Sequence, residues 1–211
     1  MASDQANPKE DRSVSPRKAP QQARAMETCA RILEGTRKLL EDEGAAAITT
    51  RNIARVSGVN VASIYQYYPN KQAILYALTK ERLDLVIAVF DRFNTPELLK
   101  KPAAEYFYEL NEAVGELQWY GKVDIELDKA IDHDTQLSDL FNLHTYQVVE
   151  RVVSLLRHFG STWPDEKLRE YAIYLYAITD SIAKLQAAGP SPHSKEWEKD
   201  HSKHLIEYCL N

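Results

Sequence analysis

Apolar residues recur every three or four positions along most of the chain, which is the pattern of amphipathic helices. In the first such segment, Cys29, Ile32, Thr36 and Leu40 fall on one stripe, and Gly44 marks its end. No segment alternates at period two for long enough to predict a sheet. The pattern predicts an all-α chain, with helices at residues 22–43, 50–57, 61–67, 70–93, 103–119, 123–132, 136–159, 165–187 and 194–209.

The first twenty residues interrupt this pattern. They are rich in Pro, Ser and charged residues and lack apolar periodicity, so residues 1–20 are predicted to be a flexible arm. We expect a first domain at 21–70 and a larger helical domain at 71–211.

Residues 50–57 and 61–67 have the character of two short helices that cross steeply. Gly58 suits the left-handed conformation that a tight turn needs, and Ala54 is small where the second helix must approach. The apolar residues expected to lock the pair are Ile53, Val59 and Ile64. This arrangement predicts a helix-turn-helix, whose second helix enters the major groove of DNA.

The second helix of this motif carries side chains that suit DNA. Val61, Ala62 and Ser63 are short and let the helix sit deep against base edges. Tyr65 and Tyr67 have hydroxyls that reach phosphate oxygens, whereas Tyr68 is expected in the core. Gln66 is able to pair with adenine.

The first helix of the motif adds a basic side chain and a capped start. Arg51 suits a bidentate contact to guanine. Thr49 and Thr50, together with the free backbone amides at the start of that helix, are suited to bind a DNA phosphate. Lys71, at the start of the next long helix, is suited to bind a phosphate as well. The predicted DNA-binding set is Thr49, Thr50, Arg51, Asn60, Val61, Ala62, Ser63, Tyr65, Gln66, Tyr67 and Lys71.

Charge is distributed unevenly along the chain. The net charge is −5, but residues 12–80 hold eleven Lys and Arg against five Asp and Glu, whereas 81–211 hold fourteen against twenty-three. This distribution indicates that only the N-terminal part meets phosphate. The basic residues of the arm either follow the DNA backbone or enter a minor groove, or they belong to a solvated tail; they are Arg12, Arg17, Lys18 and Arg24.

The segment from Thr49 to Lys71 resembles the signature of TetR-type transcriptional regulators. The matching residues are Thr49-Thr50-Arg51-Asn52-Ile53-Ala54, Gly58-Val59 and Ile64-Tyr65-Gln66-Tyr67-Tyr68-Pro69-Asn70-Lys71, together with Ile32 to Gly35 and Gly44. The resemblance covers about residues 22–80. It departs at Val61, where many relatives have a polar or charged side chain, so a contact to a thymine methyl is the expected use there.

The resemblance implies a three-helix DNA-binding domain followed by a helical domain for ligand binding and dimerisation. Carried over position by position, family contacts to DNA fall on Thr50, Arg51, Val61, Ala62, Ser63, Tyr65, Tyr67 and Lys71. The implied function is a ligand-responsive repressor that binds a palindromic operator as a homodimer. The alternatives are an activator, a ligand-independent DNA-binding factor, or a helical small-molecule-binding protein.

Aromatic residues gather in the middle helices and suggest an apolar cavity. Ordinary packing is the alternative for each of them. The predicted partner is a small lipophilic or aromatic effector, and Asp124, Glu126 and Asp128 either favour a cation or form a solvated acidic face. The predicted ligand-binding residues are Phe90, Tyr106, Leu110, Trp119, Tyr120 and His144; Phe107, Leu143 and Tyr146 are further candidates.

The last two long helices are the predicted dimer interface, with intramolecular packing as the alternative. Their stripe is Leu168, Tyr171, Ala172, Leu175, Ile178, Thr179 and Ile182, joined by Trp197, His204, Leu205 and Tyr208.

Other function classes find little support in the sequence. No metal-binding spacing, nucleophile motif or glycine-rich phosphate loop is present, so we expect no metal, no cofactor and no enzymatic activity. No apolar run approaches the length of a membrane span, and the N-terminus has no signal core. A cytoplasmic protein with no membrane partner is the expectation.

Overall fold

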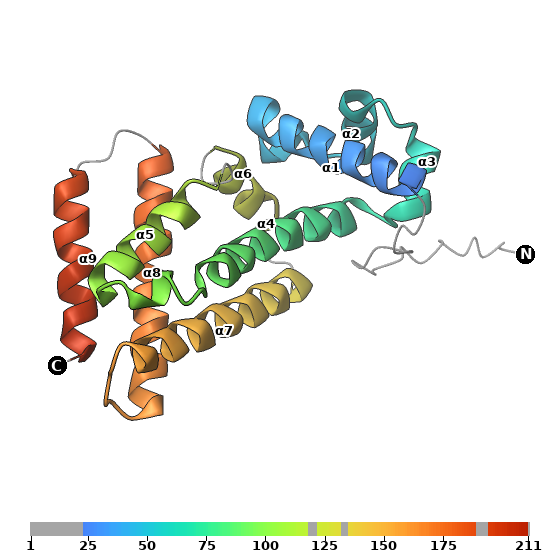
Figure 1. Ribbon diagram of the computed structural model, residues 1–211. Coiled ribbons are helices and arrows are strands. Elements are labelled where there is room, and N and C mark those ends of the chain that lie inside the picture. The colour runs from blue at the N-terminus through green and yellow to red at the C-terminus, as the bar shows by residue number, and fades with distance from the viewer. Residues whose placement is uncertain (1–22, 118–121, 132–134, 189–193, 211) are drawn as a thin grey trace, which may run out of the picture. The chain divides into compact units, whose positions relative to one another are not determined.

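The computed structural model describes residues 23–117, 122–131, 135–188 and 194–210, and every regular element within them is helical (Figure 1). The prediction of an all-α chain is therefore confirmed. The α-helices are α1 (Ala23–Glu43), α2 (Thr50–Ser57), α3 (Val61–Tyr67), α4 (Lys71–Phe93), α5 (Ala103–Gly115), α6 (Lys122–Ile131), α7 (Thr135–His158), α8 (Asp165–Ala188) and α9 (Lys195–Leu210).

Sequence periodicity missed some local features of these elements. Two short 3₁₀ turns, η1 (Ala45–Ala47) and η2 (Leu98–Lys100), were not expected. Helix α5 ends at Gly115 instead of the predicted residue 119, because the amide of Leu117 already donates to the carbonyl of Val114. The predicted arm at 1–20, and Trp119 and Tyr120, lie outside the described residues.

The chain divides into two compact units, Met1–Leu78 and Thr79–Asn211. The division falls inside α4, because the first two turns of this helix bury Ala73, Ile74, Leu75 and Leu78 in the first unit. A domain boundary between residues 70 and 71 stays a prediction.

The first unit is a three-helix arrangement closed by the start of α4. Its core contains the three residues expected to lock the helix pair, Ile53, Val59 and Ile64, and Tyr68 is buried as predicted. Two glycines end elements with positive φ: Gly44 (79°) after α1 and Gly58 (65°) between α2 and α3. These conformations are ones that a side chain with a Cβ rarely adopts.

Gly35 marks a close approach between α1 and α2. A Cβ built at this position would lie 2.6 Å from Cβ of Ser57 and 2.8 Å from its Cα. Ala54 of α2 was the small residue expected at a close approach between helices, and the structure shows a second such position in α1, where only glycine fits. Since backbone lies against Gly35, the neighbouring helix has to move if any side chain is added.

Replacing Gly35 with alanine should therefore destabilise the first unit. Overpacking of this kind costs about 1–3 kcal/mol, which outweighs the gain of about 1 kcal/mol from higher helix propensity. Urea unfolding followed by circular dichroism measures the change. Gly115→Ala is the matched control, because a Cβ there meets nothing within 4 Å; equal stability changes in the two variants would contradict the close approach.

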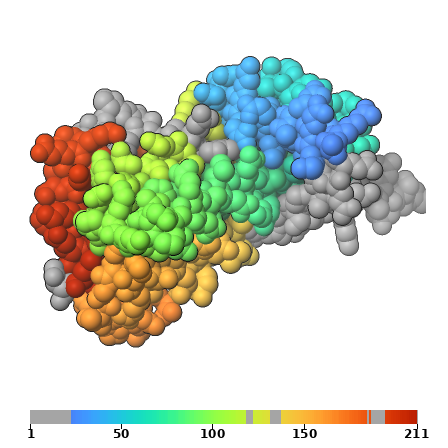
Figure 2. Space-filling view, viewed as in Figure 1, coloured from blue at the N-terminus to red at the C-terminus, as the bar shows by residue number. Residues whose placement is uncertain are grey.

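The second unit has its own core, formed where α4, α5, α7, α8 and α9 converge. Tyr106 is central: its ring contacts the rings of Phe93, Phe107 and Phe159 at 5.2–5.9 Å, and its hydroxyl donates to the carbonyl of Phe93 at 3.2 Å. Helix α9 lies against α5, and the atoms of the two helices adjoin on the face shown in Figure 2. The core residues of α8 include Leu168 and Ala172.

A buried ion pair joins α4 to α6 within this unit. Arg82 donates from Nη1 to Oδ1 of Asp124, and Oδ1 of Asp128 lies 3.6 Å from the same nitrogen. The guanidinium also sits 5.4 Å from the ring centroid of Phe141 on α7. Arg82 and Asp124 retain only 12% and 4% of their side-chain exposure. The acidic residues of α6 are thus neither an open cation site nor a solvated face.

Candidate DNA-binding surface and ligand cavity

The start of α2 is fixed by its own side chains. Oγ1 of Thr49 accepts a hydrogen bond from the amide of Asn52 at 3.1 Å, so Thr49 is the N-cap. The amide side chain of Asn52 donates to the carbonyl of Ala47 at 2.8 Å, which ties α2 to the preceding turn. Thr50 and Arg51 then lie in the first helical turn, where backbone amides have no acceptor inside the helix. This is the geometry that a phosphate group needs.

Helix α3 presents one face outward and one face inward. Asn60 caps it by accepting from the amide of Ser63 at 2.7 Å, and Ile64 is completely buried on the inner face. The exposed positions are Val61, Ala62, Tyr65 and Gln66, with Val61 38% and Tyr65 45% exposed. Ser63 and Tyr67 are half-buried at the flanks. Gln66 therefore shares the outer face with Tyr65, a point the sequence alone left open.

The arginines around this motif have different tasks. Arg31 donates from Nη2 to the carbonyls of Ser57 and Gly58 at 3.1 and 3.0 Å, and so holds α1 to the turn. Arg55 pairs with Glu43 at 2.7 Å. The side chain of Arg51 is exposed and makes no hydrogen bond or ion pair within the part of the chain that the structure describes. A guanidinium that the fold does not use is available to an external partner.

Lys71 lies beside the same surface, at the start of α4. Asn70 accepts from the amide of Ala73 at 2.8 Å and caps this helix. Nζ of Lys71 is 3.4 Å from the carbonyl of Ile48, a weak contact that leaves donors for a phosphate. This contact brings Lys71 close to the capped start of α2, because Ile48 directly precedes Thr49 in the chain.

The positive charge of the folded first unit is modest. Residues 23–78 contain seven Lys and Arg against five Asp and Glu, and Glu34 and Glu43 are paired with Arg37 and Arg55. Much of the basic excess found along residues 12–80 therefore lies in Arg12, Arg17 and Lys18, outside the described residues. Within the predicted DNA-binding set, the basic side chains are those of Arg51 and Lys71.

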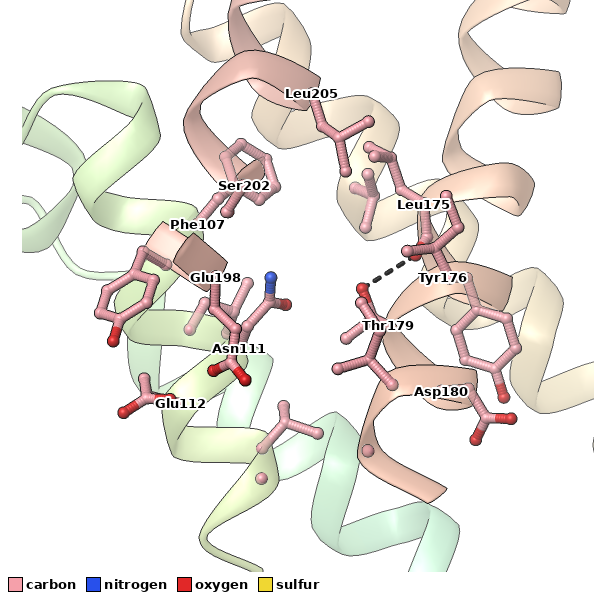
Figure 3. A pocket seen from close by; sticks show the side chains of 18 of the residues that line it. Phe107, Asn111, Glu112, Leu175, Tyr176, Thr179, Asp180, Glu198, Ser202 and Leu205 are labelled. Carbon is pink, nitrogen blue, oxygen red and sulfur yellow. Dashed lines mark hydrogen bonds between the residues drawn. The ribbon is translucent and has the colours of Figure 1, made fainter. Parts of the chain in front are cut away.

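The second unit contains a cavity of about 180 Å³ between α4, α5, α7, α8 and α9. In Figure 3, Phe107, Asn111 and Glu198 lie across the space from Leu175 and Thr179 of α8. The hydroxyl of Thr179 is already used, since it donates to the carbonyl of Leu175 at 2.8 Å. The lining is mainly apolar, with a few polar groups, which is typical of a site for a small molecule.

The predicted ligand-binding residues are placed differently with respect to this cavity. Phe90, Leu110 and His144 line it, as does Phe107. Tyr106 does not, because its ring and hydroxyl are satisfied inside the core. The further candidates Leu143 and Tyr146 point away from the core and are 56% and 62% exposed. A role in binding stays a prediction for Phe90, Leu110 and His144.

The cavity also contains residues that the sequence analysis did not single out for it. They come from α8 and α9, whose stripes had been assigned to a dimer interface: Leu175, Ile178, Thr179, Ile182, Trp197 and Leu205. Leu168 and Ala172 of the same stripe are fully buried within the chain, so for them the intramolecular alternative holds. Their helical spacing indicates that these residues are buried, but it does not show whether each face packs against the cavity, the core or another subunit.

His144 is the most unusual polar group of the cavity. It is 3% exposed, and its Nδ1 has no hydrogen-bond partner among the described residues. Burial lowers the pKa of His144 from 6.5 to about 4; the positive charges of Arg82 and Arg151 also lower it, while Asp84 and Asp180 act in the opposite direction. The imidazole is therefore neutral at neutral pH.

This depressed pKa should make the stability of the second unit fall in mild acid. In the unfolded chain the imidazole takes up a proton below pH 6.5, whereas the folded chain resists protonation until about pH 4. The free energy of unfolding should then decrease between these two values, by about 3 kcal/mol in total. Urea unfolding at several pH values measures this for the wild type and for His144→Phe. A variant with the same pH profile as the wild type would contradict the prediction.

The described residues offer no support for two other classes of site. No group of three or more His, Cys, Asp or Glu side chains lies close enough together to hold a metal ion within them. No helix among them is long and apolar enough to cross a membrane.

Comparison with known proteins gives a match for the N-terminal part. Residues 32–78 match the model of a family described as bacterial regulatory proteins, tetR family. This range contains α2, α3 and the start of α4. A search of curated proteins gave no significant match.

Solved structures are similar over nearly the whole chain. A transcriptional regulator from Rhodococcus sp. Rha1 superimposes with a TM-score of 0.70 at 12% identity, covering 86% of this chain and 95% of the other. NalD, the secondary repressor of the MexAB-OprM multidrug efflux pump in Pseudomonas aeruginosa, gives 0.62 at 16%, covering 87% and 96%. The fatty acid degradation regulator FadR from Bacillus halodurans gives 0.65 at 16%, covering 90% and 95%. At these identities the likeness shows a shared fold.

Proposed function

We propose that this chain, whose residues 32–78 match the model of the tetR family of bacterial regulatory proteins, represses transcription as a homodimer bound to a near-palindromic operator. A small molecule in the cavity of the second unit releases the DNA. The observation that carries the proposal is the outer face of α3, where Val61, Ala62, Tyr65 and Gln66 are exposed. Four of the seven residues of α3 are exposed and uncharged. A short helix with such an outer face suits contact with base edges.

Each side chain of this surface has a proposed role. Val61 and Ala62 pack against base edges, with Val61 against a thymine methyl, and Gln66 pairs with adenine. Arg51 reads a guanine, because the fold leaves its guanidinium unused. Tyr65, Tyr67, Lys71 and the start of α2 at Thr49 and Thr50 hold phosphates; Ser63 and Asn60 shape the helix start.

Dimerisation is proposed through an exposed face of α8. Ile173, Tyr174, Ala177, Ser181 and Leu185 are all exposed, share one side of the helix and carry no charge over three turns. An uncharged, partly aromatic helix face is typical of an interface between subunits. Tyr208 of α9 extends it: its ring is 63% exposed and 5.7 Å from that of Tyr171. We call this set of six residues, including Tyr208, the dimer face.

A charge placed on the dimer face should separate the subunits. Ile173 is 50% exposed in the single chain, so Ile173→Glu leaves the fold intact but buries an unpaired carboxylate in the dimer, at a cost of several kcal/mol. Analytical ultracentrifugation should show a dimer for the wild type and a monomer for the variant. Ser154→Glu, exposed on α7, is the control. A wild type that sediments as a monomer at micromolar concentration would contradict this arrangement.

The proposed regulation is a population shift between two conformers. A ligand changes operator affinity only if it binds the two conformers with different affinity. Helix α4 is the proposed lever, because it contributes both Phe90 of the cavity and Lys71 of the DNA-binding surface.

NalD, a repressor of similar fold, supports repression over activation. Acting on DNA places the protein in the cytoplasm.

Selection from a random-sequence DNA pool at near-physiological salt tests the proposal. A near-palindromic motif with half-sites about one helical turn apart is expected. Uniform, salt-labile binding would overturn it, because such binding reports phosphate contacts alone. A footprint across the promoter supports repression, whereas one upstream of the promoter would favour the alternative of an activator.

A further inference from the structure

We infer that the cavity of the second unit takes a neutral, single-ring aromatic molecule with one hydroxyl group, and that this hydroxyl hydrogen bonds with His144. The inference deepens the proposed function, because it names the chemical class of the molecule that the proposed regulation requires. Three properties of the cavity lead to it: an unpartnered buried imidazole, the sign of the surrounding charges, and the volume.

The imidazole of His144 is the polar anchor. It lines the cavity from α7, is 97% buried, and has no hydrogen bond from Nδ1 to any described residue. The ring of Tyr176 lies edge-on to the imidazole, with the ring centroids 6.2 Å apart. A buried polar atom left without a partner costs about 1–3 kcal/mol. A ligand group that pairs with His144 recovers this energy, and a purely apolar ligand does not.

The protonation state of His144 selects the kind of group. Since its pKa is lowered to about 4, the neutral ring offers one donor and one acceptor nitrogen. A hydroxyl both donates and accepts, so it pairs with either tautomer. A carboxylate or an ammonium group is able to pair with only one kind of nitrogen.

The charges around the cavity disfavour ionised ligands. The lining includes Glu112, Asp180 and Glu198. Lys195 pairs with Glu112 at 3.0 Å, but no lysine or arginine is itself among the lining residues, so a carboxylate ligand enters a surrounding that is acidic on balance. Near His144 the balance differs: the charge of Arg82 is the strongest electrostatic influence on the imidazole, and it disfavours positive charge there. A cation would also lose its hydration in a lining made mainly of Val, Leu and aromatic side chains. A neutral molecule avoids both costs.

The volume limits the size of the ligand. The cavity measures about 180 Å³, and apolar cavities of about 150 Å³ are known to bind benzene. One aromatic ring with a small substituent therefore fits. The apolar side chains of Phe107, Leu175 and Leu205 face the space in Figure 3 and supply the contacts for the ring.

Four single-ring compounds test the inference on the full chain by isothermal titration calorimetry at neutral pH: phenol, benzene, benzoate and benzylammonium. Phenol should bind at least tenfold tighter than benzene, and tighter than both ions. In His144→Phe this preference should disappear while benzene still binds. His144→Asn, which keeps a donor and an acceptor near the Nδ1 position, should retain part of it. Phenol should also shift the imidazole NMR signals of His144, which a merely structural role would not produce.

Each outcome separates this inference from the proposed regulation. Equal affinity for phenol and benzene, tighter binding of benzoate or benzylammonium, a phenol preference that persists in His144→Phe, or no binding of any compound would overturn it. Operator release is measured separately. If phenol binds through His144 without releasing DNA, the inference stands and the proposed regulation fails. If a compound of another class releases DNA and phenol does not bind, the reverse holds.

Discussion

Replacing Ala62 with glutamate should lower operator affinity by about a hundredfold or more without unfolding the protein. Ala62 is exposed at the start of α3, so the new side chain meets no neighbour in the free chain. In the proposed complex it faces base edges between two rows of phosphates. A like charge placed in an interface costs several kcal/mol, and each 1.4 kcal/mol is a factor of ten in affinity.

The measurement is fluorescence anisotropy of a labelled operator at fixed salt, together with the unfolding curve of the variant. Ser154→Glu again serves as control, because it adds the same charge at an exposed position of α7 and should leave affinity unchanged to within about threefold. Arg51→Ala should act differently from both: it relaxes preference at one base pair by ~1–3 kcal/mol. Full affinity in Ala62→Glu would exclude the outer face of α3 from the DNA interface.

Replacing Arg82 with methionine should destabilise the second unit by about 3–5 kcal/mol. Its guanidinium neutralises Asp124, which is 3% exposed, and lies near Asp128. Removing the cation leaves Asp124 as an uncompensated charge in the interior, and this is the costly way to break a buried pair. In a protein of this size the melting temperature should fall by roughly 10 °C.

Two further variants decide whether charge or packing is responsible. Lys80→Met removes the lysine that pairs with Asp84 on α4, in an ion pair whose two side chains are more than half exposed. This change should lower the free energy of unfolding by less than about 1 kcal/mol. Arg82→Met combined with Asp124→Leu removes both buried charges and should restore most of the lost stability. If the double variant were as unstable as Arg82→Met alone, packing of the arginine against Phe141 would be the main contribution.

The site on the first unit could be predicted largely from the sequence because its determinants are local. Capping by Thr49 and Asn60, the left-handed turn at Gly58 and the burial of Ile64 all depend on residues a few positions apart. The sequence did not show, however, that Arg31 and Arg55 have partners within the fold whereas the side chain of Arg51 has none among the described residues. That difference depends on which carbonyl or carboxylate the fold brings close to each guanidinium.

The cavity could not be predicted with the same precision, because its walls come from five helices that are distant in the sequence. Aromatic content suggested Tyr106 as readily as Phe107, yet only Phe107 reaches the cavity, since Tyr106 points toward Phe93. The role of Asp124 was equally hidden. Its partner Arg82 lies 42 residues earlier in the chain, and no local pattern relates the two.

By itself the sequence determined that the chain is helical, roughly where most of the helices begin and end, and that α2 and α3 form a helix-turn-helix, because periodicity, caps and glycine turns act within a few residues. Only the tertiary structure decided which face of α8 lines the cavity and which stays exposed. A helix with apolar residues on several sides, such as α8 with Leu168 buried and Tyr174 exposed, has no local preference among partners. The choice is made by packing against α5, α7 and α9, and the same packing leaves Nδ1 of His144 without a hydrogen-bond partner among the described residues.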